Sequence, residues 1–442
     1  MAGNWKKRKL SFGVREPERS MNAREPAWGT QRAFQASLTS STWVRAVCGL
    51  FAVAGATTFV YQMQTDPTRA WRAYLVNFLF FTGMGAGGVL FACALNMSSG
   101  RWGRNVKRTA EGLGTLLPAS LLLFLFMIPG LGQILPWARV PYGPEWWLDL
   151  DFLVVRNVAG LALLSVLGVW VLSASLRTDY GFAAEHNLRF PWGGVFDRLL
   201  ARNWKGLAKE EASAKKRLGF LCPLYAIVYA LVLTIIGVDL IMSLKAHWYS
   251  TLIGAYYFVG SFYTSLAALL VAAIWIRRTR GLQEEIHSSH LHDLAKLTMA
   301  FGIVTGDFFY TQLFVIWYGN LPFETSFLID RMHATPWRTL GLLVLFLCFV
   351  LPLLAMLRQD WKKRPGPMLV FGTAVLAAMW MERFLLVGPS LTGTRDILFG
   401  PPEALITLGF FGLMGFLFFS FMARVPPVAL RDAVLDPMEE SP

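Results

Sequence analysis

Long apolar runs constrain this chain more than any other feature of its sequence. A helix needs about 20 apolar residues to cross the roughly 30 Å hydrocarbon core of a bilayer. Because backbone groups in lipid must be hydrogen-bonded within the protein, each run of that length predicts a transmembrane helix. We place ten such helices, at residues 43–63, 71–96, 113–131, 152–176, 218–243, 249–276, 295–319, 338–358, 367–388 and 402–423. The predicted fold class is all-α, a polytopic membrane protein.

The distribution of Lys and Arg tests this count independently, because cytoplasmic loops collect basic residues. With the N-terminus inside, the predicted inner segments hold 31 Lys and Arg residues and the outer segments hold 7. If one helix were missed or wrongly added, the loops after it would change sides of the membrane, and the excess of basic residues on the inner side would be inverted for them. We therefore expect a multi-pass protein with both termini in the cytoplasm. The same topology accounts for the net charge of +13, and no zinc-finger or RNP motif indicates nucleic acid.

The segments outside the apolar runs complete the predicted organisation. Residues 1–42 form a basic cytoplasmic arm that is ordered only against lipid or a partner. The transmembrane domain covers residues 43–423, and residues 424–442 form a cytoplasmic tail. The long inner connection 178–217 favours an amphipathic basic helix lying on the anionic inner surface, with a solvated linker as the alternative.

Two outer connections, 134–151 and 321–337, are rich in Trp, Pro and acidic residues. Such a composition indicates either an aromatic belt at the membrane interface or a docking surface for an extramembrane subunit. The sequence leaves both interpretations open.

Ionisable side chains at membrane depth are the main functional candidates, because each is costly in lipid and should face the bundle interior. At about 1.5 Å per helical residue, Asp307 lies roughly 17 Å and Glu382 and Arg383 roughly 23 Å from the inner boundary. Asp239 lies near the outer end of its span, as does Arg156. We predict a broken ladder from mid-membrane to the outer face. Further polar side chains along it are Asn77, Thr82, Thr305, Tyr310, Thr311 and Gln312.

Glu382 and Arg383 are neighbours in the apolar segment MWMERFLLVGPS. Adjacent residues on a helix point about 100° apart and do not face each other. Each therefore needs a partner from another helix, and Asp307 is at a depth that the Arg383 side chain can reach. The pattern is compatible with a structural ion pair that fixes helix packing and with a proton relay.

Histidines and cysteines form no evident cofactor site in the sequence. The six histidines lie in connections or at helix ends, which disfavours a transmembrane haem with facing axial ligands. The segment HSSHLHD, 287–293, has ligand residue types without the spacing of a structural zinc site. The four cysteines are isolated within apolar runs, and we expect them to be packing residues. Gly83, Gly85, Gly87 and Gly88 predict close helix packing.

Three segments resemble the NrfD-like, polysulfide-reductase-like family of membrane subunits. They are DLIMSLKAHWYSTLIGAYYFVGSF (239–262), HDLAKLTMAFGIVTGDFFYTQLFVIWYGNLPFET (292–325) and MERFLLVGPS (381–390). The resemblance covers the second to tenth spans and implies two four-helix bundles, helices 2–5 and 6–9, with helices 1 and 10 flanking them. The chain is most similar to the two such subunits of bacterial alternative complex III, a quinol:electron-acceptor oxidoreductase. This likeness implies the bacterial inner membrane.

The resemblance also separates the two sister subunits of that complex. The sister that oxidises quinol carries GHAGT in helix 2 and H-x-GRPW after helix 3, whereas this chain has MGAGGV and GLGQILPW, with Gly85 and Gly132 in place of the histidines. This implies the second, ActF-type sister, without its own redox cofactor. The implied partners are the sister membrane subunit, an outer iron–sulfur subunit, multihaem cytochrome c subunits and membrane lipid. Quinol, haem c and iron–sulfur clusters are then expected in the partners.

Three classes of function follow from these observations. The first is a structural subunit with a proton path through Asp307, Glu382, Arg383, Asp239, Tyr310 and Asn77. The second is a subunit that itself binds and oxidises quinol. The third is a secondary transporter, which would have interrupted helices in paired positions. In the family an Asp-Pro pair usually precedes the histidine that corresponds to His247, and this chain has no such pair there. His247 and Arg156 are candidate outer-face residues.

Overall fold

The computed structural model describes most of the chain, and its helices coincide with the predicted spans. The described residues are 42–185, 204–333, 335–357, 361, 364–392 and 399–435. Within them every regular element is helical, and ten helices are long and apolar enough to cross a membrane. The all-α fold class and the count of ten spans are confirmed. The predicted arm before Thr42 lies outside the described residues.

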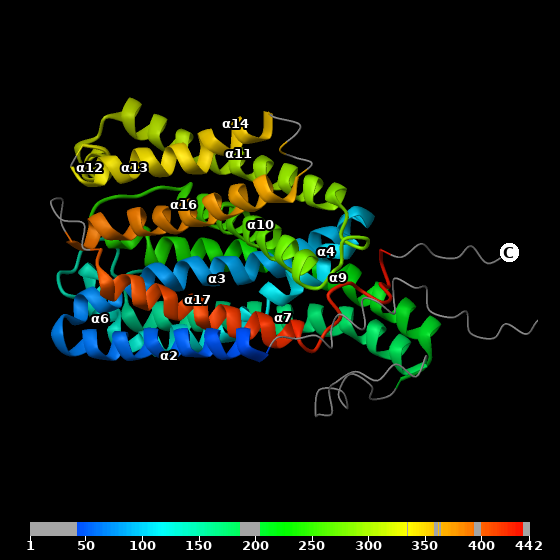
Figure 1. The fold of residues 1–442 in the computed structure, drawn as a ribbon. Coiled ribbons are helices and arrows are strands. Elements are labelled where there is room, and N and C mark those ends of the chain that lie inside the picture. The colour runs from blue at the N-terminus through cyan, green and yellow to red at the C-terminus, as the bar shows by residue number, and fades with distance from the viewer. Residues whose placement is uncertain are drawn as a thin grey trace, which may run out of the picture.

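Eight of the ten spans form two groups of four that lie side by side, as the resemblance implied (Figure 1). The first group consists of α3 (Pro67–Ser98), the run α4 (Arg104–Leu113), α5 (Leu116–Met127) and α6 (Leu131–Ile134), α7 (Leu150–Glu185) and α9 (Leu207–Leu240). The second consists of α10 (Ile253–Thr279), α11 (Ser288–Gly319), the run α13 (Trp337–Leu345), η5 (Phe346–Val350) and α14 (Leu351–Leu357), and α16 (Pro365–Thr392). The flanking helices α2 (Thr42–Thr65) and α17 (Pro401–Met422) pack against each other and against α3.

Helix ends follow signals in the sequence. Pro67 occupies the first turn of α3, where its missing N–H costs nothing, and the Asp66 side chain accepts a hydrogen bond from the Arg69 amide at 3.1 Å. The left-handed residues Ser99 and Asn320, with φ of 50° and 45°, end α3 and α11. Local chemistry therefore sets where these spans begin and end.

The two groups meet along α3 and α10, which are the most deeply buried spans of the described chain. Gly83 and Gly87 of α3 face Ser261 and Ser265 of α10, and a Cβ atom at Gly87 would lie 2.6 Å from the Ser265 Cβ. Only residues without a side chain permit such an approach. The prediction that the glycine-rich stretch of α3 serves close helix packing is confirmed, because in lipid small residues let backbones come near each other.

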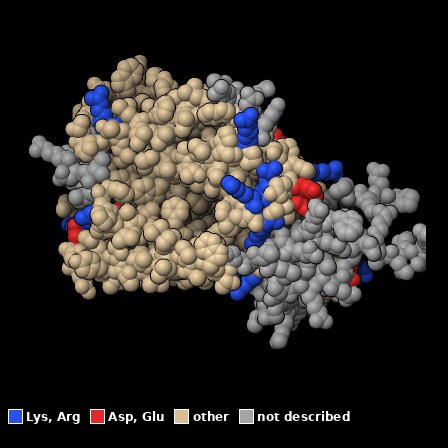
Figure 2. Space-filling model, in the orientation of Figure 1, with Lys and Arg blue, Asp and Glu red and all other residues tan. Residues whose placement is uncertain are grey.

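Lys and Arg side chains gather at one end of the helix assembly, and the flank that Figure 2 shows is almost free of charged side chains. We name this the basic end; it contains the start of α4, the end of α10, the start of α16 and the segment that follows α17 (Figure 1). The opposite end contains α12 (Pro322–Met332), for which the sequence predicted no helix.

One prediction about a connection is wrong. Residues 207–217 were expected in a separate surface helix, but they form the first turns of α9, whereas residues 186–203 lie outside the described chain. In the described part of the predicted cytoplasmic tail, residues 425–430 are buried. The Arg431 guanidinium pairs with Glu211 of α9 at 2.6 Å, which ties the tail to that helix.

Arg331 of α12 compensates for a proline in α16. Pro389 lies inside α16 and cannot donate a hydrogen bond to the carbonyl of Leu385. The Arg331 Nε atom donates to that carbonyl at 3.1 Å, and Nη2 donates to the Leu386 carbonyl at 2.6 Å. The buried arginine thus satisfies the end of α16, which gives α12 its place on the bundle.

The close approach of α2 and α17 gives a first prediction. A Cβ atom at Gly409 would lie 2.6 Å from the Gly55 Cα, whereas one at Gly49 would meet nothing within 4 Å. Gly409→Ala should therefore lower stability by about 1–3 kcal/mol, the usual effect of overpacking, and Gly49→Ala should not. Thermal unfolding of both variants in detergent measures this difference. Equal melting temperatures would contradict the packing of these two helices.

Candidate functional site

An ion pair lies in the interior of the second bundle, within α16. The Arg383 Nη1 atom is 2.7 Å from Glu382 Oε2, and the Tyr256 hydroxyl of α10 donates to Glu382 Oε1 at 2.7 Å. Both charged residues are buried, with exposed fractions of 3% for Glu382 and 1% for Arg383. The Arg383 guanidinium lies over the Tyr257 ring, 4.7 Å from its centroid. Neighbouring groups from α10 therefore hold both charges.

The prediction that Glu382 and Arg383 need partners from other helices is wrong for the ion pair itself. The two side chains leave the helix in different directions, but the long Arg383 side chain bends back to the Glu382 carboxylate. Asp307, the predicted partner of Arg383, is exposed and forms no ion pair within the described part of the chain. One arginine nitrogen, Nη2, is buried without an acceptor among the described residues.

Asp239 of α9 and Arg156 of α7, each expected near the outer end of its span, form an ion pair. The Arg156 Nε and Nη2 atoms each donate to one Asp239 carboxylate oxygen at 2.7 Å, and the Asn157 amide donates to the same carboxylate at 2.6 Å. The guanidinium also lies 4.1 Å from the Trp147 ring centroid. The bidentate hydrogen bonds and the contact with the Trp147 ring stabilise this ion pair, which lies near the opposite end of the assembly.

Asn77 joins three spans through its amide. Its Nδ2 atom donates to the Ala73 carbonyl at 2.8 Å and to the Thr407 hydroxyl at 3.0 Å, and its Oδ1 accepts from Trp380 Nε1 at 3.0 Å. The amide thereby connects α3, α17 and α16. Asn77 is not in hydrogen-bond contact with Glu382 or Asp239.

Tyr310 and Asp307 lie on an exposed face of α11, away from the ion pair. Tyr310 is 60% exposed, and its ring stacks on Phe314 at 6.1 Å between centroids. Thr305, two residues before Asp307, lies near Gly260, which also borders Arg383. Asp307 is thus at the depth of the ion pair but on the other side of its helix.

His247 lies at the opposite end of the assembly in a left-handed conformation, with φ of 60°. Its ring centroid is 6.2 Å from that of Tyr142 and 5.5 Å from that of Phe323, and it borders a cavity of about 220 Å³. Burial raises the pKa of Tyr142 to about 12, and its hydroxyl donates to the Ser243 carbonyl at 2.8 Å. The aromatic side chains around His247 form a compact surface between two outer connections.

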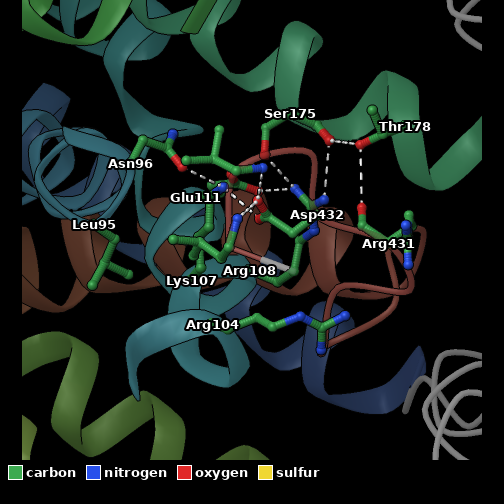
Figure 3. A network of polar contacts seen from close by, with 12 residues as sticks. Leu95, Asn96, Arg104, Lys107, Arg108, Glu111, Ser175, Thr178, Arg431 and Asp432 are labelled. Carbon is green, nitrogen blue, oxygen red and sulfur yellow. Dashed lines mark hydrogen bonds and ion pairs between the residues drawn. The ribbon is translucent and has the colours of Figure 1, made fainter. Parts of the chain in front are cut away.

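A second buried charge network lies at the basic end (Figure 3). Lys107 Nζ is 2.6 Å from Asp432 Oδ2 and 2.8 Å from Asn96 Oδ1. Arg108 pairs with Glu111 and, at 2.7 Å, with Asp179. These charged groups come from α4, α7 and the segment after α17, and all are at most 3% exposed. The network closes the basic end of the first bundle.

A family model described as polysulphide reductase, NrfD, matches residues 62–393. The chain belongs to this family. The match runs from the end of α2 through α16 and therefore includes both bundles and the Glu382–Arg383 pair. No curated protein matches the chain. As an NrfD-family protein, the chain is a membrane subunit of a quinone-linked oxidoreductase, and such subunits typically work with other redox subunits in membrane complexes.

The basic-end network of this NrfD-family subunit was not predicted. Lys107 and Arg108 were counted as inner-loop charges, although they are buried in α4. A signal was present: Glu111 follows Arg108 by three residues, a spacing that places both on one helix face, and apolar residues come directly after it. Asp432 had no such signal, because only the folded tail brings it to Lys107.

The charge of Asp432 depends on its cationic neighbours. Burial alone would raise the pKa of this carboxyl, but Lys107, through charge and a hydrogen bond, and Arg108 lower it well below the usual range. Because the folded pKa is depressed, the carboxylate contributes stability above its ordinary pKa of about 3.9. That contribution decreases as the pH falls below about 4 and is lost as the pH passes through the folded pKa.

Asp432→Asn should release the tail at neutral pH. The change leaves Lys107 buried without a carboxylate, which costs about 3–5 kcal/mol in comparable pairs. Limited trypsin digestion should then cleave faster after Arg424 and Arg431. Asp293→Asn, which alters the exposed pair with Lys296, should leave cleavage unchanged. Wild-type cleavage should accelerate only below about pH 4, measured with an acid-tolerant protease. Equal digestion of both variants would contradict the buried pairing.

Proposed function

We propose that this chain is an ActF-type membrane subunit of alternative complex III, without its own redox cofactor. In this role it stabilises the assembly and carries part of a proton path coupled to quinol oxidation in its sister subunit. The basic end then faces the cytoplasm of a bacterium, because cytoplasmic segments collect Lys and Arg. The observation that supports the proposal is a series of buried polar side chains between the basic end and Glu382.

The series begins at the basic-end network. Asn96 accepts a hydrogen bond from Lys107, and its amide contacts the Cys222 sulfur at 3.5 Å. Cys222 lies on α9, one turn before Tyr225. These contacts extend the network from the buried tail at the basic end into the interior of the first bundle.

Three buried tyrosines continue the series to the ion pair. The ring centroids of Tyr225 and Tyr229 are 6.4 Å apart, and Tyr257 lies against the Arg383 guanidinium. Each of the three side chains is at most 1% exposed, and each hydroxyl donates to a backbone carbonyl. Because the hydroxyls are occupied in this way, the proposed route needs water between them. The free Nη2 donor of Arg383 is a buried polar group that such water would satisfy.

The proposed exit runs from Glu382 toward the opposite end, where Asp239 and Arg156 lie. Glu382 is the member of the series suited to proton transfer, because a carboxyl can both accept and release a proton. The ladder proposed here excludes Asp307 and Tyr310, which face outward from α11.

Asp307 and its surroundings support a contact with the sister subunit. An exposed carboxylate at mid-span is costly in lipid, and the same face of α11 exposes Tyr310, Trp317 and Tyr318. Aromatic residues are enriched at protein interfaces. We assign this face to the sister subunit, with Asp307 paired to a basic or amide side chain on it.

The glycine that replaces a family histidine supports the role without quinol oxidation. Gly85 carries no imidazole that could bind quinol, and a Cβ atom there would lie in tight contact with the Leu116 Cβ, at 3.1 Å. Quinol oxidation is therefore assigned to the sister subunit.

Glu382→Gln tests the proton path. In the complex reconstituted in liposomes, this change should abolish most of the proton translocation that accompanies quinol oxidation, because an amide cannot exchange a proton. Glu403→Gln is the matched control: it removes another buried carboxylate, paired with Arg69 at 2.5 Å, outside the proposed path. It should lower stability and leave the protons moved per electron unchanged. Unchanged proton translocation by an intact Glu382→Gln complex would contradict the proposed proton path.

Asp307→Asn tests the subunit contact. Loss of the charge should weaken association with the sister subunit about tenfold, the effect of 1.4 kcal/mol, and leave proton translocation by the remaining intact complex normal. Native gel electrophoresis after mild detergent treatment gives the fraction of intact complex. Asp293→Asn, at the first turns of α11, serves as control. A complex as robust as the wild type would refute this assignment of the α11 face.

A further inference from the structure

A large cavity opens on the flank between α16 and α17 and has no part in the proposed proton path. Its volume is about 670 Å³, within the range of small-molecule sites. Its walls are formed by apolar side chains of α3, α10, α16 and α17, among them Phe81, Trp275, Leu369, Phe418 and Phe419. Figure 2 shows this face hollowed between the two helices, with Lys and Arg side chains gathered toward the basic end.

The basic end of this cavity is bordered by Arg277 and Arg278 at the last turn of α10, and by Gln283. Neither arginine forms an ion pair with a residue that the structure describes, and Arg277 Nε is buried without a hydrogen-bond acceptor there. The acidic residues Glu284 and Glu285 follow in the same connection but do not line the cavity. Two guanidinium groups thus face one end of an apolar cavity without a carboxylate to neutralise them.

The neighbouring arginine holds this border in place. Arg280 Nη2 donates to the Met422 carbonyl at 3.0 Å, which fastens the connection after α10 to the end of α17. The basic border and the α17 wall of the cavity are therefore joined by a direct contact.

We infer that this cavity binds an anionic phospholipid from the leaflet at the basic end. The phosphate of the lipid accepts hydrogen bonds from Arg277 and Arg278, since guanidinium groups match phosphate oxygens, and Gln283 contacts the headgroup. The acyl chains lie along the aromatic and aliphatic walls. Basic pockets between transmembrane helices on the cytoplasmic side are a known type of acidic-lipid site.

Two simpler explanations account for less of this geometry. Arginines at a helix C-terminus complement the helix dipole, but that role needs neither an apolar cavity nor a buried, unsatisfied Nε atom. A neutral quinone would fill the apolar walls, but its headgroup carries no charge to neutralise the guanidinium groups. An anionic headgroup with long apolar chains matches both parts of the site.

The experiment measures lipid binding by the full-length chain, purified in detergent with the subunits that accompany it. Phosphatidylglycerol and phosphatidylcholine with identical acyl chains are titrated in turn, and bound lipid is counted by native mass spectrometry. We expect phosphatidylglycerol to bind in preference. Arg277→Gln with Arg278→Gln should weaken that binding about 30-fold, the effect of two basic contacts.

The matched control is Arg101→Gln with Arg424→Gln, which removes the same charge from exposed residues of the basic end that do not border the cavity. It should bind phosphatidylglycerol like the wild type. Arg277→Lys with Arg278→Lys keeps the charge and should retain most of the binding, which keeps the test decisive if the glutamine variant fails to fold.

Three results would overturn the inference. They are equal binding of the two lipids by the wild type, an equal loss in the control variant, and displacement of the lipid by millimolar inorganic phosphate, which would reveal a simple anion site. None of these results bears on proton translocation, so this inference and the proposed function can fail separately.

Discussion

The ion pair of Glu382 and Arg383 is the constraint around which the second bundle is built. Neither charge can reach bulk water, so removing one would leave the other unpaired in a medium of low polarity. Tyr256 donates to the carboxylate and Tyr257 presents its ring face to the guanidinium, so α10 is held against α16 at this depth. Gly260 leaves the space that the arginine occupies, because a Cβ atom there would lie 3.2 Å from Nη2.

Polar contacts of the same kind hold the ends of the assembly. Lipid chains are as apolar as the helix surfaces, so packing of small residues and polar contacts direct association in the membrane. At the opposite end Glu403 of α17 binds Arg69 of α3. At the basic end Asp432 binds Lys107 and thereby draws the segment after α17 onto the first bundle. Residues more than 300 positions apart are joined at both ends in this way.

The sequence predicts how deep each charged residue lies along its span, but it does not predict the direction in which the side chain points. Asp239 and Arg156 share a depth on adjacent helices, and the structure pairs them, a contact that their depths alone did not specify. Asp307 has the depth of Arg383 but lies on the exposed face of α11, because the rotation of a helix about its axis depends on its neighbours. Arg383 instead pairs with its chain neighbour Glu382. Its side chain is long and flexible enough to bend back, although adjacent residues point in different directions on a helix.

The sequence by itself determined the ten spans, the all-helical class and the family of this chain. Spans are readable because lipid forces each segment to satisfy its own backbone groups, which requires a fixed length of apolar helix. Only the tertiary structure decided which charges are buried together, that the tail closes the basic end, and that Lys107 and Arg108 lie inside the protein. Those outcomes depend on contacts between distant segments, and the one local signal, the three-residue spacing of Arg108 and Glu111, does not specify the distant partners.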